Sequence, residues 1–349
     1  MAIQQADQAA ISHVLRRVTF GPFPGSIDRF VGRPVGDVVD WALAAAPLVV
    51  KPNAEPPADA GYEVVAEAWV ENLRNPAQGL HEKLTWFWHS HFTTSVDKVG
   101  RQRLLWRQQQ TLRTHALGNF RDLTRAMTTD GAMLEYLDGA NSQADAPNEN
   151  YAREMMELFA LGRGSYTEAD VRAGARALAG WKIDSERGDA VVFDAKAFGL
   201  TPFLDFLGVR GRFGVDELVD AVCNHEACAP FVAGKLYSFL VGTAPTKARR
   251  QELADVFRRN GLAIRPLVEN ILRGEDFESA RLSRPRYPLE CRTATPIMRG
   301  CDQALPSKPR TSSNSARGGG CIAVWGRCRA SWRSCKESAR APVTCRISR

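Results

Sequence analysis

Residues 147–162 read PNENYAREMMELFALG, and this stretch predicts an amphipathic helix that carries charge where apolar side chains belong. Its apolar residues recur at positions i, i+4, i+7 and i+8, the spacing of a core-facing helical stripe: Tyr151, Met155, Leu158 and Phe159. At about 100° per residue, Glu154 falls on that same face, between Leu158 and Leu161. Burying a bare carboxylate costs several kcal/mol, so Glu154 must be paired, protonated or metal-bound. Glu154 is therefore the leading candidate for a functional group.

Three polar neighbours complete a candidate catalytic group around Glu154, namely Glu157, Asn150 and Arg153. Glutamates at i and i+3 share a helix face, as in the carboxylate metal sites of helical bundles. Two buried carboxylates without a cation would raise one pKa, which suits a general acid or base. The alternative is a buried network in which Arg153, four residues before Glu157, binds carboxylates and only fixes helix packing.

Two histidines in EKLTWFWHSHFTTS, residues 82–95, extend this candidate to a site for a divalent metal ion. His91 shares a helical face with Phe87 and Trp88, so we expect it to point into the core. In a continuous helix His89 points roughly the opposite way, and both could bind one metal ion only if the backbone became extended. The predicted metal ligands are His91, His89, Glu154 and Glu157. The alternative is that His91 is a core histidine bonded to a carbonyl or carboxylate.

The rest of residues 1–290 reads as a series of helices, which predicts a mainly α fold: a multi-helix orthogonal bundle with at most a small β-hairpin near 182–194. Helical periodicity marks residues 62–74, 77–92, 100–117, 119–128, 131–138, 215–224, 227–241, 246–260 and 264–273. Thr167 and Asp170 resemble a capping box that opens a further helix. The region 1–290 is one helical domain or two helical halves divided near 182–214.

Residues 291–349 differ in character from the rest of the chain. They contain 12 Lys and Arg against two Asp and Glu, whereas residues 1–290 contain 34 against 37. Six of the eight cysteines also lie in this basic, Cys-, Arg- and Ser-rich tail, which shows no helical or strand period and is predicted to be unstructured. A nucleic-acid-binding arm and a disulfide or zinc framework are two interpretations. A shifted reading frame after Glu290 is the interpretation that we favour, because the change is abrupt.

The sequence lacks the motifs of several functional classes. It has no apolar run near 20 residues, and its first 20 residues lack the pattern of a secretory signal. We therefore expect no membrane span and a cytoplasmic protein, or an exported one if an upstream start is missing. Nucleotide-binding loops, the zinc motif HExxH and the hydrolase motif GxSxG are absent. No nucleic-acid binding is expected from residues 1–290, whose net charge is slightly negative.

Three segments resemble the bacterial domain of unknown function 1800 family: HVLRRVTFGP near the start, EKLTWFWHSHFTTS at 82–95, and PNENYAREMMELFALGRGSYTEADVRAGARALAGW at 147–181. The resemblance covers about residues 10–290 and implies a helical bacterial protein without an established activity. The sequence departs from the family pattern in the tail and at FGLTPFLDFLG, residues 198–208. Members of this family are often encoded beside a sulfatase-like protein, which is the partner that the resemblance implies.

Two hypotheses remain for the function. In the first, which we favour, the bundle is a scaffold or binding protein that acts with a sulfatase-like partner, and its buried charges only set packing. In the second, it is an enzyme whose buried Glu and His residues perform hydrolytic or redox chemistry, with a divalent metal as the possible cofactor.

Overall fold

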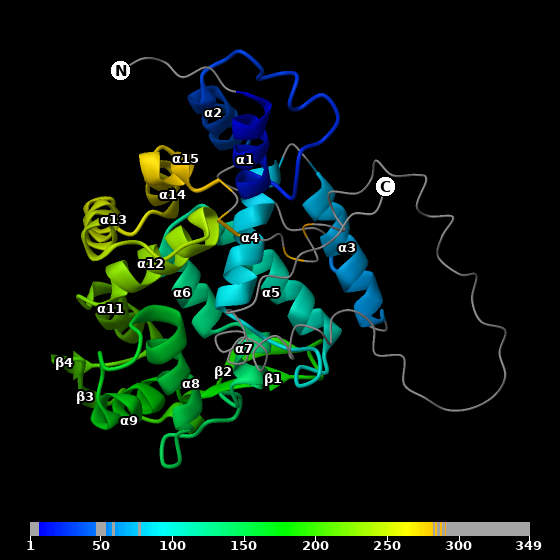
Figure 1. Cartoon of the computed structure of the whole chain (residues 1–349). Coiled ribbons are helices and arrows are strands. Elements are labelled where there is room, and N and C mark those ends of the chain that lie inside the picture. Colours follow the sequence, from blue (N-terminus) through cyan, green and yellow to red (C-terminus); the bar gives the residue numbers. More distant parts are fainter. Residues whose placement is uncertain are drawn as a thin grey trace, which may run out of the picture.

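The structure, a computed structural model, describes residues 7–46, 54–57, 60–75, 78–281, 283, 284, 287 and 290, and in this part of the chain the fold is mainly α-helical (Figure 1). The predicted fold class is confirmed. The predicted tail, 291–349, lies outside the described residues.

The fold is built around helix α4 (Gly79–His91), which lies near the centre of Figure 1. Every residue from Gly79 to Trp88 is buried. Four helices of the N-terminal half pack directly against it: α1 (Gln8–Val18), α2 (Val35–Ala45), α3 (Tyr62–Arg74) and α5 (Gln102–His115). A helix covered on all sides must bury its polar residues together with its apolar ones, and α4 does so.

The middle of the chain folds into α6 (Phe120–Thr128), α7 (Gly131–Tyr136), α8 (Glu149–Glu154), the π-helix η2 (Met155–Ala160) and α9 (Glu168–Ala177). The helix predicted over 147–162 is therefore two elements, because its winding changes at Met155. Leu161 donates its N–H to the carbonyl of Met156, five residues back, at 2.8 Å. The wider turn shifts each later side chain away from the position that a regular α-helix would give it. Thr167 and Asp170 form the predicted capping box.

Two hairpins follow α9. The first pairs β1 (Trp181–Asp184) with β2 (Ala190–Phe193), where the sequence predicts one. The second, which the sequence analysis did not include, follows α10 (Ala195–Phe198) and pairs β3 (Phe203–Phe206) with β4 (Val209–Arg212). Leu207 and Gly208 both have positive φ, 49° and 77°, as a two-residue hairpin turn requires.

The C-terminal part contains α11 (Val215–Asn224), α12 (Cys228–Val241), α13 (Lys247–Arg259), α14 (Ile264–Leu272) and α15 (Glu275–Ser279). One cluster of buried side chains runs from Ile11 to Phe277 and includes residues on both sides of 182–214. None of the described helices is long and apolar enough to cross a lipid bilayer.

Candidate functional site

The π-helix η2 ends in two carbonyl groups that accept hydrogen bonds from side chains of other helices. His91 Nε2 of α4 lies 2.8 Å from the Phe159 oxygen, and Lys235 Nζ of α12 lies 2.6 Å from the Leu158 oxygen. Carbonyls at the end of a helix lack partners within it, and cationic or polar side chains from elsewhere can bind them. His91 and Lys235 therefore tie α4 and α12 to the end of η2.

The bond to Phe159 fixes the tautomer of His91. A carbonyl only accepts, so Nε2 carries the proton and Nδ1 carries the lone pair. His91 is buried among aromatic rings, including Phe87, Trp88 and Phe92. Burial, with Lys235 nearby, lowers the pKa of His91 well below its usual value. The side chain is neutral, and its contact with Phe159 matches the alternative of a core histidine bonded to a carbonyl.

His89 faces a different neighbour from His91, because α4 is helical through both residues. The ring of His89 packs edge-on against Trp69 of α3, with 4.7 Å between the ring centres. Burial lowers the pKa of His89 to about 4. The extended backbone that a shared metal site would need here is not observed.

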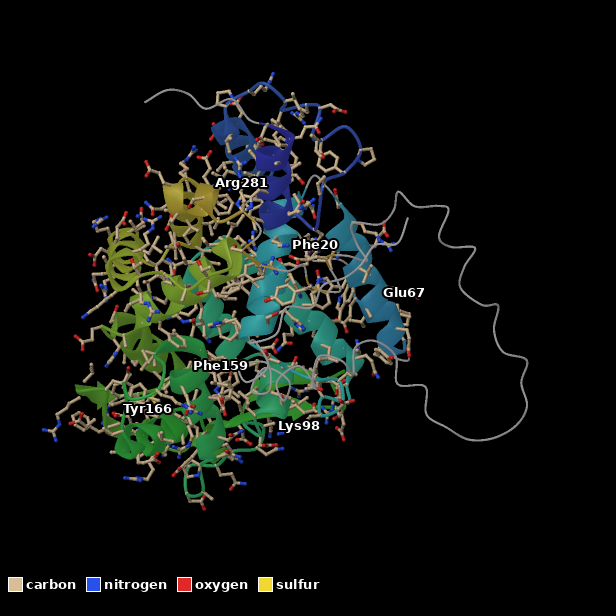
Figure 2. The ribbon with its side chains drawn as sticks, viewed as in Figure 1. Phe20, Glu67, Lys98, Phe159, Tyr166 and Arg281 are labelled. Atoms are coloured by element: carbon tan, nitrogen blue, oxygen red, sulfur yellow. The ribbon has the colours of Figure 1, made fainter. Side chains whose placement is uncertain are left out.

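The candidate residues on α8 and η2 have separate sets of partners. Arg153 binds Glu149 and Glu168, with its Nη1 2.5 Å from Glu168 Oε1. Glu157, in contrast, accepts from Arg163 Nε at 2.5 Å and from the hydroxyl of Tyr166 at 2.8 Å. Figure 2 labels Tyr166 in the lower left part of the molecule, and Phe159 is buried. Regular helical spacing would bring Arg153 and Glu157 together, but each of them binds other side chains instead.

Asn150 and Glu154 complete the predicted group. Asn150 is exposed, and its side-chain amide donates to the carbonyl of Leu137 at the end of α7, at 3.1 Å. Glu154 is half-buried, and its Oε2 atom is shielded from solvent.

The side chains of Arg163 and Tyr166 lower the pKa of Glu157, which is therefore ionised at neutral pH. Whether these residues act together in catalysis stays a prediction.

We predict that Arg153→Ala leaves the melting temperature close to that of the wild-type protein. Its partner Glu149 is partly exposed and its partner Glu168 is largely exposed, and ion pairs in contact with water contribute little to stability. Differential scanning calorimetry checks this result. A cooperative fall of many degrees would instead place Arg153 in a buried network.

A buried ion pair joins α4 to α5, and sequence reasoning did not single it out. Glu82 Oε1 lies 2.7 Å from Arg113 Nη2 and 2.8 Å from Arg113 Nε, and both side chains are almost fully buried. Burial raises the pKa of Glu82, and Arg113 opposes that rise. In the described part of the chain, Glu82 Oε2 and Arg113 Nη1 have no hydrogen-bond partner. The pair is thus held by a single shared carboxylate oxygen.

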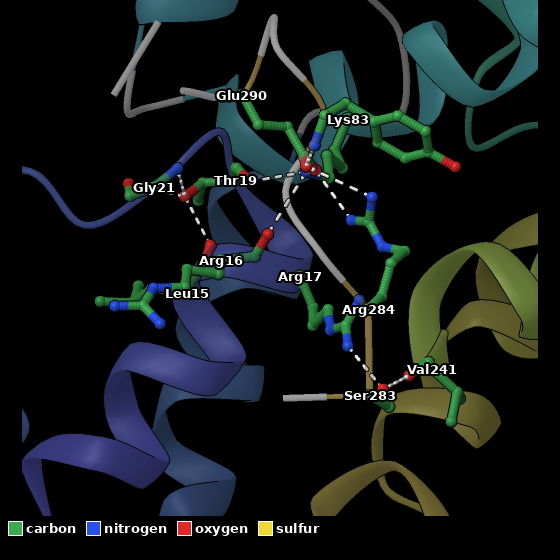
Figure 3. A network of polar contacts seen from close by, with 11 residues as sticks. Leu15, Arg16, Arg17, Thr19, Gly21, Lys83, Val241, Ser283, Arg284 and Glu290 are labelled. Atoms are coloured by element: carbon green, nitrogen blue, oxygen red, sulfur yellow. Dashed lines mark hydrogen bonds and ion pairs between the residues drawn. The ribbon is translucent and has the colours of Figure 1, made fainter. Parts of the chain in front are cut away.

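A second buried ion pair lies on the next residue of α4 (Figure 3). Lys83 Nζ binds Glu290 Oε1 and also donates to the carbonyl of Thr19, just after α1, at 3.0 Å. Glu290 accepts further hydrogen bonds from Arg284 Nη2 at 2.8 Å and from the N–H of Tyr287 at 2.7 Å. Burial lowers the pKa of Lys83 to about 8, against the opposing effect of Glu290. Arg284, Tyr287 and Glu290 are thereby tied to the centre of the bundle.

A third buried polar group surrounds Asp130, which caps α7 by accepting from the N–H of Met133 at 3.0 Å. Gln108 Nε2 lies 3.2 Å from the same carboxylate oxygen, and Thr94 donates to Gln108 at 2.6 Å. Burial raises the pKa of Asp130 to about 7, although Met133 and Gln108 act to lower it. Asp130 therefore titrates near neutrality in the folded protein.

We predict that Asp130→Asn flattens the dependence of stability on pH. The pKa of Asp130 is raised on folding, so its contribution is fully present below about pH 4 and is lost as the pH rises through about 7. A rise of about three pKa units corresponds to a loss on the order of 4 kcal/mol. Asn keeps the cap of α7 and does not titrate. Urea unfolding of both proteins between pH 4 and 8 tests this, and parallel curves would contradict it.

One open pocket, of about 280 Å³, lies at the end of α7 beside β1. Its polar lining consists of Arg101, Glu135, Asp138 and Asn141. Asp138 and Asn141 have positive φ values of 58° and 66°, which are uncommon for residues other than glycine and recur at ligand sites. Lys98 Nζ neutralises Asp138 at 2.8 Å.

No group of three or more His, Cys, Asp or Glu side chains that could hold a metal ion occurs within the described ranges. The metal site predicted on His91, His89, Glu154 and Glu157 stays a prediction.

Comparison with known proteins adds one match. The model of a family described as "Protein of unknown function (DUF1800)" matches residues 13–315, which extends past Glu290 into the tail. No curated protein and no solved structure matches the chain.

Proposed function

The chain belongs to the DUF1800 family of proteins of unknown function, and on that premise we propose that it is a helical scaffold that binds a partner protein. In this proposal its buried polar side chains hold helices together and do not perform chemistry. The partner that we propose is the sulfatase-like protein that the family resemblance implies.

The observation that carries this proposal is that the His91 side chain is buried and bound to a backbone carbonyl. Its one N–H is bound to the carbonyl of Phe159, its ring is enclosed by aromatic side chains, and burial keeps it neutral. A catalytic acid or base must reach the proton that it transfers, within about 3 Å or through one water molecule. A buried ring that donates to a helix end fulfils a packing role instead. Glu82 and Lys83 fit the same interpretation, since each binds an oppositely charged side chain of a distant segment.

The direct test mixes the purified full-length chain with a purified sulfatase-like protein of the kind that the family resemblance implies, and measures binding by isothermal titration calorimetry. We expect a saturable complex with a fixed stoichiometry. The His91→Phe variant is the matched control, because it removes the imidazole and keeps an aromatic ring in the core. Equal binding by His91→Phe supports the scaffold. Absence of binding by the wild-type chain would contradict the proposal.

A second candidate function is an enzyme, with a divalent metal as its possible cofactor, and the pocket beside α7 is the observation that favours it. Arg101, Glu135 and Asp138 offer charged groups at the surface, and two left-handed residues line the same pocket. The test is elemental analysis of the purified chain for bound metal, repeated with Glu135→Gln, which removes a carboxylate that lines this pocket. Stoichiometric metal that is lost in the variant supports the enzyme. We expect no stoichiometric metal in either protein.

A further inference from the structure

We propose that the open edge of the β3–β4 hairpin binds an extended, acidic segment of a partner protein, which adds to β4 as a third strand. This inference rests on the proposed scaffold function and names the surface and the chemistry of the partner.

Exposed apolar side chains occur on both faces of this hairpin and in the residues before it. Seven large apolar residues are exposed in the described part of the chain, and four of them lie between residues 193 and 209: Phe193, Leu200, Phe203 and Val209. Leu200 is 88% exposed and Phe203 is 69% exposed. Gly199, at φ 69° and ψ −146°, turns the chain immediately before Leu200. Among these residues Val209 lies on β4 itself, on the face opposite to Phe203, because it pairs with Phe206.

The backbone of β4 has one free edge. In the described residues the sheet has two strands, and β3 lies against α9. The N–H of Phe213 donates to the carbonyl of Pro202 at 3.0 Å, so these two residues form a hydrogen-bonded pair. Because such pairs alternate along an antiparallel ladder, the N–H and C=O groups of Arg210 and Arg212 point away from β3. These groups are the template for an added strand.

The positive charge of this edge favours an acidic partner strand. Residues 200–213 contain Arg210 and Arg212 but only one carboxylate, Asp205, which lies 3.4 Å from Arg210. Arg210 is 75% exposed at its side chain. Arginines on an edge strand discourage pairing with neutral or basic strands, and they favour an acidic one.

A second copy of the chain does not fit this edge. Only Arg210 and Arg212 offer outward backbone groups on β4, so pairing with another β4 would place arginine opposite arginine. Like charges that face each other across a strand pair are destabilising. An acidic segment with alternating apolar residues meets both features of this edge. Its carboxylates reach the arginines on one face, and its apolar side chains reach Val209 on the opposite face.

The test uses fluorescence anisotropy with the full-length chain and a labelled peptide of alternating Glu and Val. We expect saturable binding that weakens as salt is added, and no binding of the matched Lys and Val peptide. Arg210→Glu with Arg212→Glu should weaken the acidic peptide by about tenfold or more and create binding of the basic one. Val209→Ser should weaken binding of the acidic peptide, whereas Val64→Ser, at a similarly exposed apolar residue on α3, should not. All the substituted residues are exposed, so circular dichroism should show an unchanged fold.

Several outcomes would overturn the proposal: no binding of the acidic peptide, equal binding of both peptides, or binding that survives the charge reversal. The same variants separate this inference from the scaffold function. If the full-length partner binds the wild-type and the Arg210→Glu, Arg212→Glu chain equally, the scaffold stands and this surface is wrong. If the acidic peptide binds as described but the sulfatase-like protein does not, the surface stands and that partner is wrong.

Discussion

Replacing Glu290 with alanine is expected to lower the free energy of unfolding by about 3–5 kcal/mol. Lys83 is fully buried, and without Glu290 its charge would have no carboxylate partner. Arg284, which binds the same carboxylate, would add a second unpaired cation to the same place. Urea unfolding at neutral pH, followed by tryptophan fluorescence, measures the loss.

The control for this prediction is Glu71→Ala. The side chain of Glu71 is 79% exposed, and its carboxylate lies as far as 3.9 Å from its partner Arg74. We expect its effect to be within about 0.5 kcal/mol. The double variant Lys83→Met, Glu290→Leu should recover part of the stability, because apolar residues of similar volume can replace a buried ion pair, while Arg284 still lacks its carboxylate. A loss below about 1 kcal/mol for Glu290→Ala would show that Lys83 does not depend on Glu290.

Replacing Arg113 with methionine is the other substitution with a large expected effect, again about 3–5 kcal/mol. It leaves the buried carboxylate of Glu82 with no cation at 2.7 Å. The bond from His81 should survive, since it reaches the backbone carbonyl of Arg113 at 2.6 Å. The loss then combines the unpaired charge on Glu82 with the hydrogen bond from Arg113 to Gln78, which is 3.2 Å long. Equilibrium unfolding in urea again provides the measurement.

Two further variants separate charge from shape at this position. Arg113→Lys keeps the positive charge and loses the planar group that donates twice to Glu82, so we expect an intermediate loss. Glu82→Gln in the Arg113→Met background should restore part of the stability, because it removes the buried charge. If Glu82→Gln gave no recovery, the loss would come from packing around Arg113.

Most helices could be predicted from the sequence, because apolar periodicity reports directly which face of a helix is buried. The helix predicted over 62–74 has those bounds in the structure, and 215–224 does as well. The surroundings of the candidate site were less predictable. The positions of Arg153 and Glu157 were inferred from regular α-helical spacing, and η2 breaks that spacing at Met155. A π-helix leaves no periodic signal over six residues, so the partners of Glu157 could not be inferred.

The buried pairs on α4 were missed for a different reason. Glu82 and Lys83 are adjacent charged residues in the sequence, which is typical of an exposed helix face. Their partners lie 31 and 207 residues away along the chain, at Arg113 and Glu290. The pattern of neighbouring residues cannot predict contacts between residues so far apart in the sequence. A signal was nevertheless present, since LTWFWHSHF follows directly and is apolar on nearly every side, which indicates a helix that is buried all round.

Buried charges are expected to hold this bundle together, and a double-mutant cycle between Lys83 and Glu290 tests this most directly. The cycle compares the unfolding free energies of the wild type, Lys83→Met, Glu290→Leu and the double variant. We predict a coupling energy of about 2 kcal/mol or more, because the two side chains are in contact and shielded from water. A coupling energy below about 0.5 kcal/mol would contradict the claim.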